Sequence, residues 1–124
     1  MSHEIWIPIW RPVTLNALLG CKLRERMRLK KQDRDFVTCY FRASEIPKAT
    51  GKRRVSLELF LARGQKERDP DSMWKVLADS LVKCGALVDH TNEYVEYGYV
   101  MHHRNHKTGP QIVGTMIILD DVNG

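Results

Sequence analysis

The sequence is poor in the features that mark secreted and membrane-spanning proteins. It has three scattered cysteines, Cys21, Cys39 and Cys84, and no Cys-x-x-Cys pair. This odd number excludes the disulfide framework of small secreted domains and favours reduced, mostly buried thiols. No apolar run approaches the roughly 18 residues of a membrane span, and no basic segment followed by an apolar one begins the chain. We therefore expect a cytoplasmic protein without a membrane partner.

Two kinds of catalytic motif are also missing. The chain has no glycine-rich loop of the type that cradles nucleotide phosphates. Ser72 and Ser80 have no nearby histidine that would activate a hydroxyl nucleophile. Internal repeats and low-complexity segments are absent as well. These absences argue against a nucleotide-driven motor, a serine hydrolase and a repeat protein.

What the chain does have is an uneven distribution of positive charge. Its 124 residues carry a formal net charge of +5. Between Cys21 and Arg54, twelve lysines and arginines face only four acids, so the remainder of the chain is net acidic. A basic half of this kind is typical of a protein that binds a polyanion such as DNA, although charged helix faces exposed to water give the same pattern. The candidate DNA-binding residues are Lys22, Arg26, Lys30, Lys31, Lys52, Arg53 and Arg54.

The hydrophobic pattern predicts one α+β domain spanning residues 1–124. We expect strands at 4–10, 55–61, 94–101 and 112–119, with the last two pairing as a hairpin around a polar turn at 102–110. Apolar residues at helical spacing run from Leu15 to Phe41, with an interruption at Lys31-Gln32-Asp33 that predicts two helices or a kinked one, ending near Ser44. A further helix follows Asp69. The expected architecture is a small mixed sheet of about four strands packed against two or three helices.

The segment around Asp69-Pro70-Asp71 has a purely structural interpretation. Asp69 is a favourable N-cap, Pro70 suits the first helical position, and Asp71 complements the helix dipole. Gly85 suits the position just after the helix. The buried stripe of this helix would be Met73, Leu77, Leu81 and Cys84, with Asp71, Lys75 and Asp79 on the opposite side. A cap needs only one acid, however, and here two stand at a helix start reached through a basic loop.

The same residues form a longer pattern: Asp69-x-Asp71-x-x-x-Lys75-x-x-x-Asp79-x-Leu81, then Gly85 and Asp89. This pattern resembles the RusA-like Holliday junction resolvases of phages and prophages. Their hallmark is an Asp-x-Asp-Asn start, a lysine four residues after the second aspartate, then Asp-Ala-Leu, a glycine and two adjacent aspartates. The order of the flanking elements is also compatible with that family. Outside the motif there is no further match of individual residues.

The resemblance implies an enzyme, a homodimeric Mg²⁺-dependent endodeoxyribonuclease that nicks branched DNA symmetrically during recombination and repair. By that resemblance Asp69, Asp71 and Asp89 would bind the metal and Lys75 would face the scissile phosphate. Asp79 would be structural. Such a hydrolase needs Mg²⁺, or Mn²⁺ in its place, to activate water and offset charge on the phosphate.

This chain departs from the family pattern at two positions. Ser72 stands where the family has asparagine, and His90 stands where it has the second of the paired aspartates. We favour Asp89 as the replacement ligand, but His90 itself and Glu93 are alternatives, and histidine suits Mn²⁺ or Zn²⁺ better than Mg²⁺. The change at His90 leaves a second hypothesis open: a catalytically weakened or inactive protein that still binds DNA junctions. A third is a basic adaptor whose acids only cap a helix.

Other chemical groups give weaker signals. His102, His103 and His106 resemble a metal cluster, but they fall in the expected polar turn without a carboxylate or cysteine at matching spacing. We interpret them as a solvated loop. Trp6, Trp10 and Trp74 are interpreted as core residues in preference to base-stacking platforms.

Overall fold

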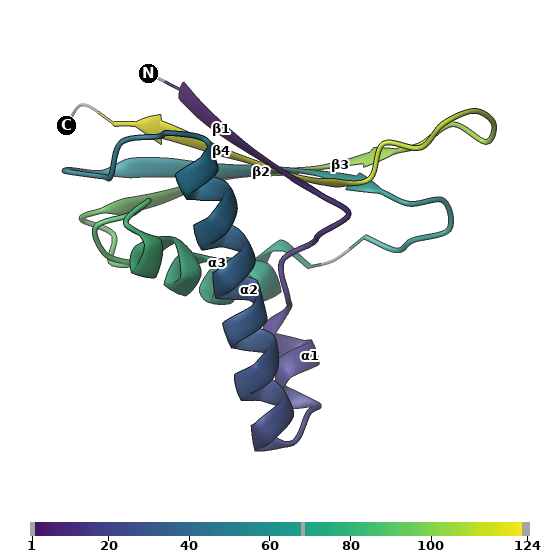
Figure 1. Cartoon of the computed structure of the whole chain (residues 1–124), viewed down its shortest axis with the longest axis horizontal. Coiled ribbons are helices and arrows are strands. Elements are labelled where there is room, and N and C mark those ends of the chain that lie inside the picture. The colour runs from purple at the N-terminus through teal and green to yellow at the C-terminus, as the bar shows by residue number, and fades with distance from the viewer. Residues whose placement is uncertain (1, 68, 123–124) are drawn as a thin grey trace.

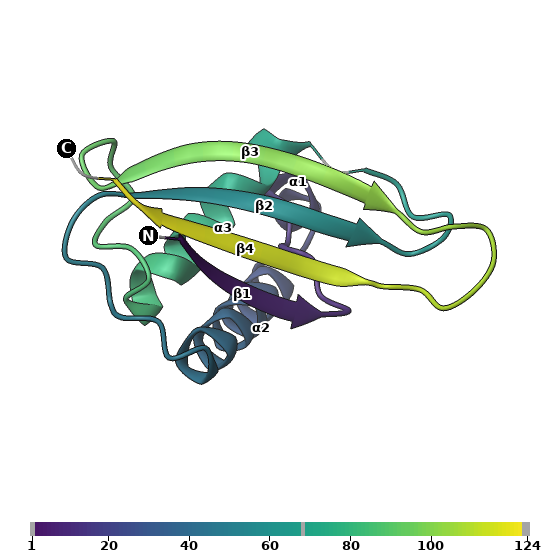
Figure 2. The same ribbon diagram turned by 90° about the horizontal axis from the view of Figure 1, so that it is seen from above.

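A computed structural model describes residues 2–67 and 69–122 of the chain (Figure 1). In chain order the elements are β1 (Ser2–Pro8), α1 (Leu15–Leu19), α2 (Leu23–Ala43), β2 (Arg53–Leu61), α3 (Pro70–Cys84), β3 (Val95–Arg104) and β4 (Gly114–Asp121). The strands form one mixed sheet in the order β1-β4-β2-β3. All three helices lie on one face of it (Figures 1 and 2). This confirms the predicted α+β domain with a four-stranded sheet.

The pairing of the strands differs from the predicted hairpin. Strand β3 pairs in parallel with β2, and β4 runs antiparallel to both β1 and β2. Parallel neighbours need a crossover connection, which α3 supplies between β2 and β3. The hairpin prediction is therefore wrong: β2 lies between β3 and β4, and the chain crosses β2 before β4 joins the sheet. A local pattern of two strands and a turn does not reveal which third strand enters between them.

The break in the first helical region also lies elsewhere than expected. Helix α1 ends at Leu19, with Gly20 as its C-cap, and α2 then runs without interruption from Leu23 to Ala43. Asp33, which interrupts the apolar pattern, lies on the buried side of α2, where its carboxylate accepts hydrogen bonds from the Val13 N–H (3.4 Å) and the Ser80 hydroxyl (3.3 Å). A buried charge with such partners can belong to the inner face of a helix. From the sequence alone, Asp33 is expected to be exposed, because the residues that satisfy its charge lie far away in the chain.

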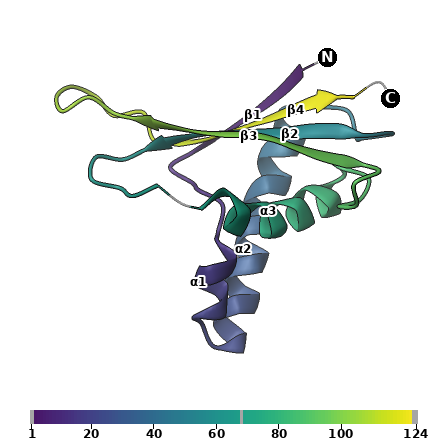
Figure 3. The same ribbon diagram turned by 180° about the vertical axis from the view of Figure 1, so that it is seen from behind.

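The core lies between the sheet and the helices. Along β2, Val55, Leu57, Leu59 and Leu61 are almost wholly buried. They meet the stripe predicted for α3, which is Met73, Leu77, Leu81 and Cys84. Seen from behind, α3 lies directly beneath the sheet, whereas α1 and the first half of α2 extend away from it (Figure 3). The sheet and α3 thus form the base of the molecule, and α2 carries positive charge outward from it.

The cysteines are less buried than predicted. All three are free thiols, and Cys84 is buried, but Cys39 is exposed and Cys21 is half-buried. Burial raises the pKa of the Cys84 thiol. None of the described helices combines the length and apolar character required to cross a bilayer.

Candidate functional site

The start of α3 has the cap predicted from the sequence. Asp69 is the N-cap, and its side chain accepts a hydrogen bond from the Asp71 N–H (3.2 Å), with Pro70 in the first turn. At the other end Gly85 has a φ of 92°, a left-handed conformation that favours glycine. The capping role of Asp69 is therefore real, and it occupies one oxygen of that carboxylate. It does not prevent the second oxygen from taking another partner.

A surface hollow of about 320 Å³, the α3 hollow, lies beside the first turns of α3. Its lining side chains come from three elements: Asp71, Trp74, Lys75, Ala78 and Asp79 from α3, His90 from the following loop, and Tyr97 from β3. The indole of Trp74 and the ring of Tyr97 lie 5.0 Å apart between centroids. Asp71, Lys75 and Asp79 are exposed because they repeat every four residues along the side of α3 that faces away from the core.

The hollow is lined by two of the four predicted catalytic residues and by one of the three predicted metal ligands. Asp71 and Lys75 line it, as does Asp79. Asp69 and Asp89 are not among its lining residues. Asp89 accepts a hydrogen bond from the His90 N–H (2.7 Å) and lies 3.2 Å from the His90 ring Nδ1. Of the alternatives for the far end of the motif, His90 is the residue that faces this hollow.

Sequence reasoning missed the two aromatic residues of the hollow. Tyr97 belongs to β3, the strand that follows α3 in the chain. Its pKa is raised by burial and by the negative charge of Asp79. Trp74 packs against the core, as predicted, but it is half-buried and also lines the hollow. Its position directly before Lys75 was the available signal, because neighbours on a helix diverge by about 100° and one can reach the core while the next faces water.

The donor set suits a hard divalent cation only in part. Within the described ranges, no three histidine, cysteine, aspartate or glutamate side chains gather closely enough to hold a metal ion. Mg²⁺, however, keeps several waters and is commonly bound by one or two carboxylates together with substrate phosphates. Asp71 and Asp79 both line the hollow, but eight residues separate them, about 12 Å along the helix axis, so they cannot share one ion. The residues therefore fit an ion held by one carboxylate of the hollow, Asp71, and completed by water and a phosphate, better than a closed protein cage.

The predicted basic surface is largely exposed, with one exception. Lys22, Lys30, Lys31 and Arg54 are exposed, and Arg26 and Lys52 are half-buried. Arg26 donates from Nε to the Cys21 carbonyl (2.9 Å), and Arg54 pairs with Glu96 (3.4 Å). The assignment of Arg53 to a DNA-binding surface is wrong. Its side chain is 2% exposed and binds Asp121, Ala86 and Pro47 inside the protein.

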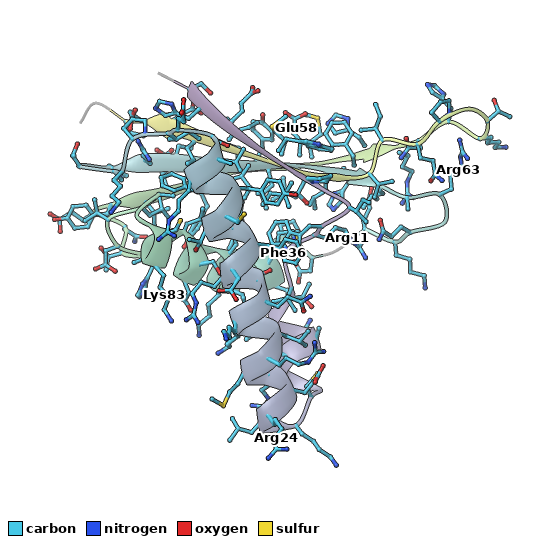
Figure 4. The ribbon with its side chains drawn as sticks, viewed as in Figure 1. Arg11, Arg24, Phe36, Glu58, Arg63 and Lys83 are labelled. Atoms are coloured by element: carbon cyan, nitrogen blue, oxygen red, sulfur yellow. The ribbon has the colours of Figure 1, made fainter. Side chains whose placement is uncertain are left out.

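Two of the three histidines do not lie in the predicted turn, because β3 extends as far as Arg104, whereas His106 lies in the loop before β4 as predicted. His102 and His103 belong to that strand. His103 stacks on Phe60 with a centroid distance of 4.4 Å, and its Nε2 lies 2.7 Å from a carboxylate oxygen of Glu58. Glu58 projects from the face of the sheet opposite the helices (Figure 4). His103 is thus part of a cross-strand cluster remote from the hollow beside α3.

The larger hollow of the molecule, about 560 Å³, runs along α2 and holds one acid, Asp35, beside Arg28 and Lys31. It lacks the acid–lysine–acid series of the α3 hollow, which is therefore the stronger candidate for chemistry. Comparison of the chain with protein family models and with curated proteins gives no match, so the evidence for function is the site itself.

Proposed function

We propose that the protein is a metal-dependent, structure-selective endodeoxyribonuclease that cleaves branched DNA such as Holliday junctions. The single observation that carries this proposal is the composition of the α3 hollow. Asp71, Lys75, Asp79 and His90 line it together, although they span twenty positions of the chain. These are positions of the pattern that resembles RusA-like resolvases, and a site open to solvent is accessible to a large substrate.

Each residue would have a distinct role in phosphodiester hydrolysis. Asp71 would hold Mg²⁺ or Mn²⁺ from within the hollow, and Asp69, two residues before it, and Asp89 would be the other protein ligands. Asp79, two turns further along α3, would keep a structural role. When bound, the ion would lower the pKa of a coordinated water and neutralise charge on the phosphate. Lys75 would place its ammonium group against a non-bridging phosphate oxygen. His90 would be a further metal ligand or would bind the phosphate itself.

The distribution of charge supports a nucleic-acid substrate. Most DNA affinity comes from neutralising phosphates with lysine and arginine, and α2 carries exposed cations away from the sheet. Paired nicks at a four-way junction require two active sites, so we propose a homodimer as the active form. A role in DNA recombination or repair would place it in the cytoplasm.

The direct test is a nicking assay on a synthetic four-way junction. Purified protein should introduce paired nicks with Mg²⁺ or Mn²⁺ and none in EDTA. A linear duplex of matched length and sequence is the control substrate, and it should be cut at least about tenfold more slowly. Binding of the junction without cleavage by either metal would reject the enzymatic proposal.

A second candidate is a junction-binding protein whose catalysis is weak, and His90 is the observation that favours it. An imidazole in the α3 hollow replaces the hard oxygen ligand that Mg²⁺ prefers. Under this candidate, His90→Asp should raise Mg²⁺-supported nicking by about tenfold or more and narrow the difference between Mn²⁺ and Mg²⁺. The exposed His106, in the loop before β4, provides the control variant His106→Asp. If His90→Asp leaves nicking unchanged while wild type cleaves efficiently, the weakened-enzyme candidate is rejected.

A further inference from the structure

Next to the α3 hollow, a second and smaller hollow of about 120 Å³ lies between α2 and α3. Its lining side chains are Lys30 and Arg34 from α2, and Val76, Asp79, Ser80 and Lys83 from α3. The two α2 residues lie four positions apart, and successive α3 residues lie three positions apart or fewer. Each helix therefore presents one continuous side to the hollow. Val76 and Ser80 are buried and form its floor.

The cations around this hollow outnumber the acids by three to one, since Asp79 is its single carboxylate. Among the described residues, no carboxylate lies within ion-pair distance of Lys30, Arg34 or Lys83. Other cations of the chain do have such partners: Arg28 pairs with Glu25 and Arg54 with Glu96. Three cations that converge from two helices, none of them in an ion pair and with a single carboxylate beside them, form a favourable site for an anion.

The two hollows are adjacent because Asp79 lines both of them. Lys75 and Lys83 lie eight residues apart on α3, which corresponds to about 12 Å along the helix axis. A DNA strand has one phosphate per roughly 3.4 Å of duplex axis. A strand that presents one phosphate to Lys75 would therefore bring another, a few nucleotides away, within reach of Lys83 and Arg34.

We propose that the hollow between α2 and α3 is a phosphodiester-binding subsite that holds the DNA backbone a few nucleotides from the cleaved bond. This inference rests on the proposed function and extends it. Arg34 provides a planar fork that suits bidentate contact with phosphate, while Lys83 and Lys30 act as point charges. The subsite aligns the strand along α3 and thereby determines which phosphate of the strand lies at Lys75.

The negative charge of Asp79 affects where along α3 the backbone phosphates can bind. A carboxylate shared by the two hollows repels a phosphate placed directly between them. Backbone phosphates are then favoured on either side, at Lys75 and at Lys83. Lys83 also lies in the last turn of α3, where it complements the helix dipole and needs no acidic partner. That structural role and phosphate binding are compatible.

The test measures how junction binding depends on salt, in EDTA so that cleavage does not contribute. Removing one phosphate contact should lower the slope of log K against log salt by about 0.9. Lys83→Gln and Arg34→Gln should each show this loss, and the double variant about twice as much. Lys107→Gln is the matched control, because Lys107 is exposed in the loop before β4 and lines neither the α3 hollow nor the one between α2 and α3. Its slope should equal that of wild type.

The outcomes separate this inference from the proposed function. Equal slopes for all variants, or equal losses at Lys83, Arg34 and Lys107, would overturn the subsite even if wild type nicks junctions. Selective losses at Lys83 and Arg34 support the subsite, whether or not the wild type nicks. If wild type fails to bind the junction at low salt, both the subsite and the proposed function are rejected. Circular dichroism of each variant establishes that it is folded.

Discussion

Replacement of Asp71 by asparagine is expected to reduce metal-dependent junction nicking by at least about 100-fold while junction binding persists. Asparagine keeps the shape of the side chain but removes the negative charge that would hold the ion in the α3 hollow. Loss of even an outer-shell partner of a metal site commonly costs 10- to 100-fold, so loss of a direct ligand should cost more. Binding should hold or strengthen, because one repulsive charge near the phosphate disappears. Single-turnover nicking and equilibrium binding, measured on the same preparation, provide both quantities.

The matched control for this variant is Asp35→Asn. Asp35 is an exposed acid on α2 that lies outside the α3 hollow, so its neutralisation changes the net charge equally without touching the site. It should nick at the wild-type rate. Asp71 lies in the first turn of α3, where loss of an acid costs about 0.3–1 kcal/mol through the helix dipole. An active Asp71→Asn enzyme would exclude this carboxylate as a required ligand.

Arg53→Met is expected to destabilise the fold by about 2–4 kcal/mol. The buried guanidinium of Arg53 donates to Asp121 (2.8 Å), to the Ala86 carbonyl (3.0 Å) and to the Pro47 carbonyl (2.8 Å). Hydrogen bonds from charged donors contribute about 1.5–3 kcal/mol each. Methionine fills much of the volume and removes the cost of burying a charge, so the net loss is smaller than the sum. The melting temperature should fall by roughly 10 °C.

Arg54→Met is the control, because it removes the same charge at the next position of β2. The Arg54 side chain is 44% exposed and pairs with Glu96 at 3.4 Å, and exposed pairs of this kind contribute at most about 1 kcal/mol. Its melting temperature should change little. Equal destabilisation by the two substitutions would show that the Arg53 contacts do not hold the β2 and β4 ends together. The guanidinium of Arg53 also lowers the pKa of the Asp121 carboxyl, with a smaller contribution from His3.

Local chemistry explains why much of α3 could be predicted from the sequence. The cap at Asp69, the proline at position 70 and the left-handed Gly85 depend on backbone geometry within a few residues. The buried stripe from Met73 to Cys84 follows from a period of 3.6 residues. Each of these features is decided by neighbours in the chain. They were therefore found where they were expected.

The errors concern contacts between residues far apart in the chain. Arg53 appeared to belong to a basic turn, and only the return of β4 beside β2 brings Asp121 to it. Asp33 appeared to interrupt a helix, and only α3 supplies the Ser80 hydroxyl that satisfies it. His103 appeared to lie in a solvated loop until β2 placed Glu58 and Phe60 beside it. From sequence alone, a charged residue is predicted to be exposed, because the distant partner that allows its burial is not known.

By itself the sequence determined the elements, the ends of α3 and the exposed acid–lysine–acid ladder of Asp71, Lys75 and Asp79, because helix periodicity and capping act within a few turns. Tertiary structure alone decided that His90 and Tyr97 close a hollow around this ladder. It alone also brought Lys30 and Arg34 of α2 opposite Lys83 of α3. These juxtapositions come from the packing of α2 on α3 and from the parallel pairing of β3 with β2. Both depend on side chains that lie far apart along the chain.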